Sequence, residues 1–573
     1  MQGARALVEV LRESGVRHVF GLPGDTGMAF YDALRDVRGE IDHIMTRDER
    51  SASFMADAYA RVSGRIGVCE GPSGGGATYI VPGVAEAQGS AIPLLCLTSD
   101  TPVNQHGRGV LTELDQEGLF RPVTKWNTRV NSSATMAESA RRAIRMATAG
   151  RPGATHLSLP TDSLEGDTPD SSVYGVPECG RVPAMRTRPD QALIERAAAE
   201  LAAAERPVIV AGGGVLISEA CHELAALAEA LNVPVATSIN GKGSISETSP
   251  VAIGVIGGNG ARPYANACSA GADLIVYVGS RTDSTTTCHW TNPSIENPPK
   301  IVQIDVAPYE VGNNYPVAVG LVGDARLTLA AMLEAVSRPA AVAERNRGRI
   351  EHLQQERRAY WADVDRQAAV RSQPIKPAQV VRAMRESLDD EAIIVADPGT
   401  PTPFLCAQYE FRRPGRTTVI PRAHGGLGYA IPAVVGAWFA GDGRRVVGMT
   451  GDGSFGMSVG ELETITRYGL PIVIIQCSNG SFGWIKELQH LYHDDRYFGV
   501  DFNPVDYAAI ARGFGFRASR VSDPDDVERA VQVALADGGP YFLDVLTESP
   551  ITETPPVAAW VAAEAARQIV TGD

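Results

Sequence analysis

Residues 446–480 read VVGMTGDGSFGMSVGELETITRYGLPIVIIQCSNG. An apolar strand is predicted up to Thr450, a helix over about residues 459–468, and a second apolar strand over residues 471–476. Asp452 therefore follows the first strand, and Asn479 follows the second. Because a crossover helix places two such strands in parallel, both residues are expected at the same edge of one sheet.

These two strand ends have the composition of a site for a metal ion and a phosphate group. A hard cation such as Mg²⁺ takes oxygen ligands, which Asp452 and Asn479 supply as a carboxylate and an amide carbonyl. The glycines beside Asp452 let phosphate oxygens approach the backbone, and a helix N-terminus favours an anion. If Gly451-Asp452-Gly453 is considered alone, a surface turn is the alternative. Gly441-Asp442-Gly443 is such a turn, since the same spacing of 24 residues leads to no asparagine after a strand.

The same alternation of strand and helix patterns continues along all 573 residues. Residues 208–211, 274–278 and 301–304 are apolar runs of strand length, whereas residues 197–231 have helical spacing. Parallel sheets covered by helices, an α/β fold, are therefore predicted.

Two breaks in this pattern predict three consecutive doubly wound parallel-sheet domains. Residues 164–190 are rich in Pro, Gly, Ser and Thr, and residues 337–377 hold a charged helical stretch that ends in prolines. The expected domains cover residues 1–165, 190–336 and 375–549, and residues 550–573 are interpreted as a tail that forms a lid. A proline-led turn into a buried strand occurs in both outer domains, which suggests a duplicated fold.

Composition excludes several classes of protein. The net charge of −15 disfavours a nucleic-acid partner. The eight cysteines are scattered without a Cys-x-x-Cys pair, so reduced thiols are expected rather than disulfides or a zinc site. No signal-peptide pattern and no apolar stretch of membrane-spanning length occurs. A cytoplasmic protein without a membrane partner is expected.

The strand–GDG–helix–strand–SN pattern resembles the motif of enzymes that use thiamine diphosphate (ThDP), where two asparagines follow GDG after about two dozen residues. Ser478 replaces the first asparagine, and Asn479 matches the second, which is the metal ligand in that family. The resemblance implies that Mg²⁺ is bound by Asp452, Asn479 and the backbone oxygen of Ser481. It also implies that ThDP is the cofactor, with Gly453 and Ser454 beside its diphosphate.

A second segment, MTRDERSASFMADAYAR at residues 45–61, resembles the glutamate-bearing helix of the same family, with Asp48 in place of a histidine. The resemblance implies that Glu49 bonds to the pyrimidine ring of ThDP and favours the imino tautomer that removes the thiazolium proton. Burial would raise the pKa of such an acid. A solvated acid at a helix start is the alternative when the segment is taken alone.

Further matches extend the resemblance over nearly the whole chain. VFGLPG at residues 19–24 and GPSGGGAT at residues 71–78 resemble segments that place Gly24 and Gly75 near the cofactor. The pattern is nearest to acetolactate synthase, 2-hydroxyacyl-CoA lyase and oxalyl-CoA decarboxylase. In these families the glutamate of one subunit meets the metal site of another, so a homodimer or homotetramer is implied.

Other residues are assigned to the pocket by the same resemblance. Gly399 and Thr400 match a loop that contacts the diphosphate, and Gly425 and Leu427 match the segment that grips the pyrimidine. If the segment with Gly425 and Leu427 is considered alone, a glycine turn followed by a core leucine is an equally good interpretation.

Two polar residues are expected near the reacting atoms. Gln116 matches a glutamine near the thiazolium, and Glu487 is expected on a helix facing the substrate channel, to bond a hydroxyl or move a proton. An exposed glutamate is the alternative for Glu487.

The middle domain has the sequence features of a nucleotide-binding fold. GGG at residues 212–214 and GSRTD at residues 279–283 end predicted strands, and an acid follows the next strand. The family binds FAD or ADP here, which implies that Arg281 contacts a phosphate and Asp305 a ribose. A degenerate, empty site is the alternative.

The leading hypothesis for the reaction is cleavage of a 2-hydroxyacyl-CoA to an aldehyde or ketone and formyl-CoA. It depends on Asp115 and Leu488, which differ from acetolactate synthases, and on the lid-like tail. The alternatives are an acetolactate-synthase-like carboligase or 2-oxo-acid decarboxylase, a non-catalytic ThDP-fold scaffold, and a flavin-dependent oxidase. The substrate is expected to be an acyl-CoA or a 2-oxo acid.

Overall fold

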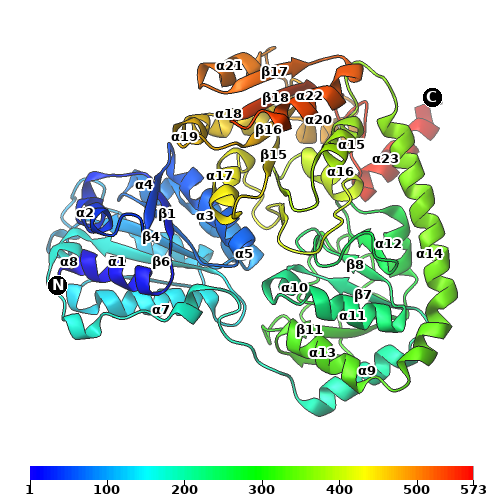
Figure 1. Ribbon diagram of the computed structural model, residues 1–573, viewed down its shortest axis with the longest axis horizontal. Helices are drawn as coiled ribbons and strands as arrows, with labels where there is room; N and C mark the ends of the chain where they lie inside the picture. The colour runs from blue at the N-terminus through cyan, green and yellow to red at the C-terminus, as the bar shows by residue number, and fades with distance from the viewer. Residues whose placement is uncertain (572–573) are drawn as a thin grey trace.

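The protein is represented by a computed structural model, which describes residues 1–571 and contains three six-stranded sheets whose strand pairs are all parallel. In Figure 1 the N-terminal sheet lies at the left, the middle sheet at the lower right and the C-terminal sheet at the top. The expected fold of three consecutive α/β domains is confirmed.

The N-terminal sheet has the strand order β2-β1-β3-β4-β6-β5. Its strands are β1 (His18–Gly21), β2 (Asp42–Met45), β3 (Gly67–Gly71), β4 (Leu94–Asp100), β5 (Trp126–Arg129) and β6 (Ala154–Pro160). Its helices are α1 (Gly3–Glu13), α2 (Met28–Asp36), α3 (Glu49–Ser63), α4 (Gly75–Tyr79), α5 (Val81–Ser90), α6 (Gln116–Phe120), α7 (Met136–Thr148) and α8 (Thr161–Glu165).

The C-terminal sheet repeats that order as β14-β13-β15-β16-β18-β17, so the two outer domains share one topology. Its strands are β13 (Ile393–Ala396), β14 (Thr418–Val419), β15 (Val446–Gly451), β16 (Val473–Ser478), β17 (Arg517–Val521) and β18 (Tyr541–Leu546). Its helices are α15 (Pro377–Ser387), α16 (Pro401–Gln408), α17 (Ala430–Ala440), α18 (Asp452–Ser458), α19 (Glu461–Arg467), α20 (Gly483–Tyr492), α21 (Tyr507–Gly513) and α22 (Val527–Ala536), followed by α23 (Ala558–Thr571).

The middle sheet has the order β12-β11-β10-β7-β8-β9, which reversed is the 3-2-1-4-5-6 order of a Rossmann fold. Its strands are β7 (Pro207–Ala211), β8 (Val235–Thr237), β9 (Ala252–Val255), β10 (Leu274–Val278), β11 (Lys300–Asp305) and β12 (Val319–Val322). Its helices are α9 (Gln191–Ala203), α10 (Gly213–Ile217), α11 (Cys221–Leu231), α12 (Pro263–Ala270) and α13 (Ala325–Ala335), and α14 (Pro339–Ala368) runs along the right edge of Figure 1.

One predicted helix differs from the structure. The helix expected over about residues 459–468 corresponds to α19, but an additional short helix, α18, begins directly at Asp452 and ends before Val459. The crossover between β15 and β16 is unaffected, and the two strands pair in parallel from Val447 and Val473 onward.

The outer domains pack tightly on each other within one chain through α3 and α17. Gly436 on α17 allows this approach, since a Cβ there would lie 1.9 Å from the carbonyl oxygen of Met55. At the N-terminal end of α17, the hydroxyl of Tyr429 donates to the buried carboxylate of Asp57. This contact fixes the loop before α17 against the N-terminal domain.

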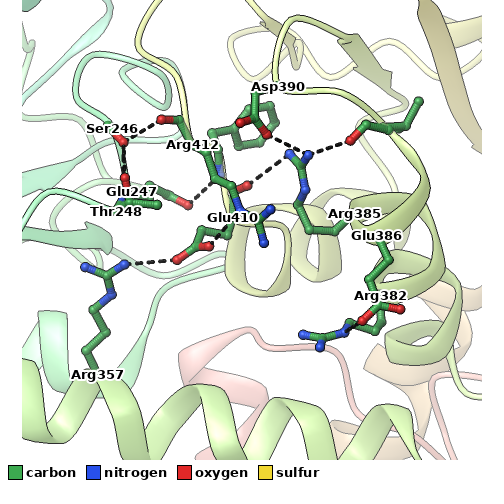
Figure 2. Close-up of polar contacts among 12 residues, drawn as sticks. Ser246, Glu247, Thr248, Arg357, Arg382, Arg385, Glu386, Asp390, Glu410 and Arg412 are labelled. Atoms are coloured by element: carbon green, nitrogen blue, oxygen red, sulfur yellow. Dashed lines mark hydrogen bonds and ion pairs between the residues drawn. The ribbon is translucent and has the colours of Figure 1, made fainter.

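A buried charge cluster joins the middle and C-terminal domains. Glu247 accepts hydrogen bonds from Lys242 at 2.7 Å and from Arg262 at 2.9 Å, and all three side chains are buried. Glu247 also accepts the backbone N–H of Phe411, from the C-terminal domain. Figure 2 shows this region, in which Arg357 of α14 reaches Glu410 at 2.9 Å. Buried charges of this kind require their partners, because none can be solvated.

No helix within residues 1–571 has both the length and the apolar character required to cross a bilayer.

We predict that Glu247→Leu lowers the free energy of unfolding by about 3–5 kcal/mol, because Lys242 and Arg262 would remain buried without a counter-charge. Denaturant unfolding measures the change. The matched control is Glu386→Ala, which breaks an exposed pair with Arg382 in the same region and should change stability by less than about 0.5 kcal/mol. Equal stability of Glu247→Leu and wild type would contradict this account of the cluster.

Candidate active site

Asp452 and Asn479 lie together at the carboxyl ends of β15 and β16. One carboxylate oxygen of Asp452, Oδ2, accepts the backbone N–H of Asn479 at 2.8 Å. The side-chain oxygen of Asn479 accepts bonds from the Ser481 backbone N–H at 3.2 Å and hydroxyl at 2.9 Å. The spacing of the motif therefore produces one compact cluster of oxygen atoms, as the sequence predicts.

A cavity of about 330 Å³ opens at this cluster. It brings together most of the residues predicted for the cofactor and the metal: Gly399, Thr400, Gly425, Leu427, Asp452, Gly453, Ser454, Asn479 and Ser481. Gly453 is required by close packing, since a Cβ there would lie 2.3 Å from the ring of Phe482.

The donor set fits a divalent cation that carries a diphosphate. The second carboxylate oxygen of Asp452, Oδ1, is buried and has no hydrogen-bond partner in the part of the chain that the structure describes. Burial raises the pKa of Asp452. A cation bound at Oδ1 would satisfy this oxygen and favour the ionised carboxylate, with Asn479 and Ser481 as further oxygen ligands.

Asp397, directly after β13, holds the loop that carries Gly425 and Leu427. Its carboxylate accepts the backbone N–H groups of Gly428, Tyr429 and Ala430 at 3.0–3.1 Å, and the hydroxyl of Thr450 at 3.1 Å. Asp397 thus ties the start of α17 to β15, which places Leu427 in the cavity wall.

Glu86 of α5 holds the preceding part of the same loop from the N-terminal domain. Its buried carboxylate accepts the backbone N–H groups of residues 422–425, including that of His424 at 2.7 Å. Burial alone would raise the pKa of Glu86, but Arg61 and these N–H donors lower it overall. Sequence reasoning missed Glu86, because the loop that it holds lies more than 330 positions away in the chain.

The predicted N-terminal residues form a second group. Glu49 is the first residue of α3, where Asp48 caps the helix by accepting the N–H of Arg50 at 2.8 Å. Burial raises the pKa of Glu49. Its Oε1 lies 3.0 Å from the position of a Cβ on Gly76, next to Gly75, and Gly24 and Gly76 both pack on Pro72.

This group does not lie at the cavity beside Asp452 and Asn479 within one chain. Among residues 1–571, the lining of the 330 Å³ cavity does not include four of the predicted residues: Gly24, Glu49, Gly75 and Gln116. Gln116 is bonded within its own domain, where it accepts from the hydroxyl of Thr98 and donates to the carbonyl of Ser99 at 2.9 Å. Roles for these residues at the cofactor remain predictions that need a second subunit.

Glu487 lies on α20, whose first-turn residues Trp484 and Ile485 line the cavity. It is fully buried rather than exposed, and neither carboxylate oxygen has a hydrogen-bond partner in the described chain. Burial raises the pKa of Glu487 to about 7. The tail helix α23 packs on α20, with the rings of Trp484 and Trp560 4.3 Å apart. Burial thus favours the protonated form of Glu487, which is not among the residues that line the 330 Å³ cavity in the described chain.

A second cavity, of about 100 Å³, lies at the carboxyl edge of the middle sheet. Its lining includes Gly212–Gly214, Arg281 and Asp305, together with Arg151 of the N-terminal domain. Burial raises the pKa of Asp305 to about 6, and burial followed by the nearby charge of Arg281 lowers the pKa of Arg151. Two arginines facing one cavity suit a diphosphate, and Arg151 is a residue that sequence reasoning did not assign to this site.

The sequence matches three family models over residues 1–119, 194–332 and 397–545. They describe the N-terminal TPP binding domain, the central domain and the C-terminal TPP binding domain of thiamine pyrophosphate enzymes. The chain belongs to the thiamine pyrophosphate enzyme family. Thiamine pyrophosphate is another name for ThDP, so the predicted family is confirmed.

The relatives of this ThDP enzyme include proteins named as acetolactate synthases. It is 34% identical over 578 positions to a "Probable acetolactate synthase large subunit" of Methanococcus aeolicus, with 97% of this chain and 94% of the relative covered. It is 31% identical to the "Acetolactate synthase large subunit" of Haemophilus influenzae, with 94% and 92% covered. Identity to "Acetolactate synthase isozyme 3 large subunit" of Escherichia coli is 31%, with 93% and 92% covered.

We predict that Glu487→Gln removes part of the pH dependence of stability. The raised pKa means that the folded protein holds a proton that the unfolded chain, with a pKa near 4.5, has already lost. Stability of the wild type should therefore fall as pH rises from about 4.5 to about 7, and then level off. Melting temperatures measured across this range should fall less in Glu487→Gln than in wild type. Parallel curves would show that Glu487 ionises normally.

Proposed function

We propose that this chain is a ThDP- and Mg²⁺-dependent carboligase of the acetolactate synthase type, acting on 2-oxo acids. The observation that carries the proposal is the likeness over 97% of the chain to a relative named as an acetolactate synthase large subunit. The cluster of Asp452 and Asn479 supports the cofactor assignment, since Asp452 has a buried carboxylate oxygen without a hydrogen-bond partner in the described chain and lines a cavity together with the predicted diphosphate loops.

Each part of the site has one task in this proposal. Asp452, Asn479 and the backbone oxygen of Ser481 would hold Mg²⁺, and Leu427 would support the cofactor from the cavity wall. When bound, ThDP supplies the carbanion chemistry beside a carbonyl carbon. Glu49, its pKa raised by burial, holds a proton at the pyrimidine nitrogen. Glu487 donates or accepts a proton at the substrate oxygen.

The lyase hypothesis loses its main support. Asp115 caps α6 by accepting the backbone N–H of Gly118 at 2.9 Å, so its identity has a structural reason. Leu488 packs in the apolar cluster between α20 and the tail, with Trp560 and Val557. Neither difference therefore favours an acyl-CoA over a 2-oxo acid. The relatives favour the carboligase, which the sequence analysis held as an alternative.

The assembly is proposed to be at least a homodimer. Glu49 and Asp452 belong to one catalytic centre in this proposal, yet a single chain leaves Glu49 outside the cavity at Asp452. A second copy that brings its Glu49 to this cavity completes the centre.

We expect the purified protein to convert pyruvate to 2-acetolactate, and Glu49→Gln to reduce the rate by about 10²–10⁴-fold because the proton relay is lost. Acetolactate is measured as acetoin after acid decarboxylation, and aldehyde release is measured in parallel. Formation of aldehyde alone would identify a 2-oxo-acid decarboxylase. Turnover of a 2-hydroxyacyl-CoA with no turnover of 2-oxo acids would contradict the carboligase proposal and support the lyase hypothesis.

The second cavity is proposed to bind ADP or the adenine half of FAD, with Arg281 at the phosphates and Asp305 at the ribose. We expect Arg281→Met to weaken ADP affinity by about tenfold or more, because a charge-assisted bond to phosphate is lost. Isothermal titration with ADP and with FAD measures this. Arg326→Met is the control, since Arg326 pairs with Glu223 at the surface. Absence of binding of both nucleotides to wild type would indicate a degenerate site.

A further inference from the structure

Arg422 is the only cationic residue among those of residues 1–571 that line the 330 Å³ cavity. The other charged residue of this lining is Asp452, and the remaining side chains are uncharged. Asp452 belongs to the metal cluster, whereas Arg422 has no task in the proposed function. An anionic substrate that enters the cavity therefore meets a single positive side chain of the described chain.

The guanidinium of Arg422 has little compensation for its charge. Its Nε is buried and has no hydrogen-bond partner in the part of the chain that the structure describes. Burial lowers the pKa of Arg422, and the nearby Cys406, Glu86 and Asp283 act in the opposite direction. A cation that is removed from water without a paired anion costs free energy, and an anionic ligand would offset this cost.

The two acids near Arg422 are engaged by other donors. Glu86 pairs with Arg61 at 3.1 Å and accepts the backbone N–H groups of the loop that begins at Arg422. Asp283 of the middle domain accepts two backbone N–H groups of its own turn, each at 3.0 Å. Neither carboxylate forms an ion pair with Arg422 within the described residues. The backbone of Arg422 is thus held in place while its side chain keeps its charge for a ligand.

The strand order places Arg422 away from the metal cluster. Arg422 follows the edge strand β14, whereas Asp452 follows β15 and Asn479 follows β16. Because β13 lies between β14 and β15, the ends of these two strands are about 10 Å apart. Among described residues, Asp452 is also not one of the groups that shift the pKa of Arg422, whereas Asp283 of the middle domain is. A ligand group at Arg422 is therefore distinct from a diphosphate at the metal cluster.

We propose that Arg422 determines the acceptor specificity of the carboligation by binding the carboxylate of the acceptor 2-oxo acid. The proposal deepens the proposed function and rests on it, because the reaction must have an acceptor. Arginine suits this task, since its planar guanidinium can form two parallel hydrogen bonds with one carboxylate.

The chemistry of the two substrates decides which carboxylate Arg422 binds. The donor loses its carboxylate as CO₂, so a cation paired with that group would stabilise the ground state more than the transition state. The electron pair of the broken bond then forms the new bond to the carbonyl carbon of the acceptor, whose carbonyl oxygen gains a proton. The acceptor carboxylate keeps its charge from binding to product release. A fixed positive charge therefore assists the acceptor and hinders the donor.

The first test uses pyruvate as donor and two acceptors that differ only by the carboxylate, 2-oxobutyrate and propanal. We expect Arg422→Met to lower the ratio of the 2-oxobutyrate product to the propanal product by about tenfold or more, because a charge-assisted pair is lost. Arg422→Lys keeps the charge and should retain more of this ratio than Arg422→Met. Chromatography separates the two products, and release of CO₂ with propanal as acceptor should be retained in both variants.

The second test measures binding without turnover, in full-length protein loaded with ThDP and Mg²⁺. Lactate carries a carboxylate but no 2-oxo group, and lactamide is its neutral counterpart. Isothermal titration should show that Arg422→Met weakens lactate binding by about tenfold and leaves lactamide binding unchanged. Wild-type protein that binds lactate no more tightly than lactamide would contradict the proposal.

A titration of ThDP in the presence of Mg²⁺ separates the two anionic groups that Arg422 can meet. Arg422→Met should bind ThDP as tightly as wild type. A loss of ThDP affinity of about tenfold, with unchanged lactate affinity, would assign Arg422 to the diphosphate and overturn the proposal. An unchanged product ratio in folded Arg422→Met would do the same, and Arg422→Gln takes its place if the methionine variant does not fold.

Arg412→Met is the matched control, since Arg412 is an exposed arginine of the same domain that pairs with Glu410 at 3.2 Å. It should leave the product ratio and the lactate affinity unchanged. Wild-type protein that forms no carboligation product from any 2-oxo acid would count against the proposed function. The lactate titration would then still decide whether Arg422 binds a carboxylate.

Discussion

The hydrogen bond between Asp452 and the backbone of Asn479 is the contact on which the site depends. It exists because β15 and β16 are adjacent parallel strands that end at the same level, so two turns separated by a crossover meet. This bond is made to Oδ2 of Asp452, and Oδ1 has no hydrogen-bond partner in the described chain. Burying an anionic oxygen without a hydrogen-bond donor costs free energy. A cation bound at this oxygen would compensate that cost.

The rest of the cavity is held in place by two buried acids that are not among its lining residues. Asp397 and Glu86 bind successive backbone N–H groups of one loop, from the C-terminal and N-terminal domains respectively. Because each bond is made to the backbone, the loop is fixed without regard to its side chains. The side chain of Leu427 is not needed to hold the loop and forms part of the cavity wall. The N-terminal domain thus shapes a cavity of the C-terminal domain within the same chain, in addition to the role proposed for it in a partner.

The fold and the meeting of Asp452 with Asn479 were predictable from sequence because they depend on local patterns. A strand, a turn and a crossover dictate that Asp452 and Asn479 meet, and apolar runs identify the sheets. Glu86 was not predictable, because the loop that it holds lies far away in the chain. The hydrogen bonds of Gln116 and of Asp115 lie within the N-terminal domain, and no sequence pattern shows which partners such side chains take. The reaction cannot be predicted from single residues such as Asp115 and Leu488, because their contacts are a helix cap and an apolar cluster, which would suit either substrate.

The contact between Trp484 and Trp560 has a practical consequence. One ring belongs to the helix that follows the metal loop and the other to the helix near the C-terminus, and they lie 4.3 Å apart. Two indoles at this separation influence each other's emission, so the protein carries a built-in optical reporter of whether its tail is seated. A displacement of the tail helix would separate these two rings and change their share of the emission of the six tryptophans, so it could be followed without any attached dye.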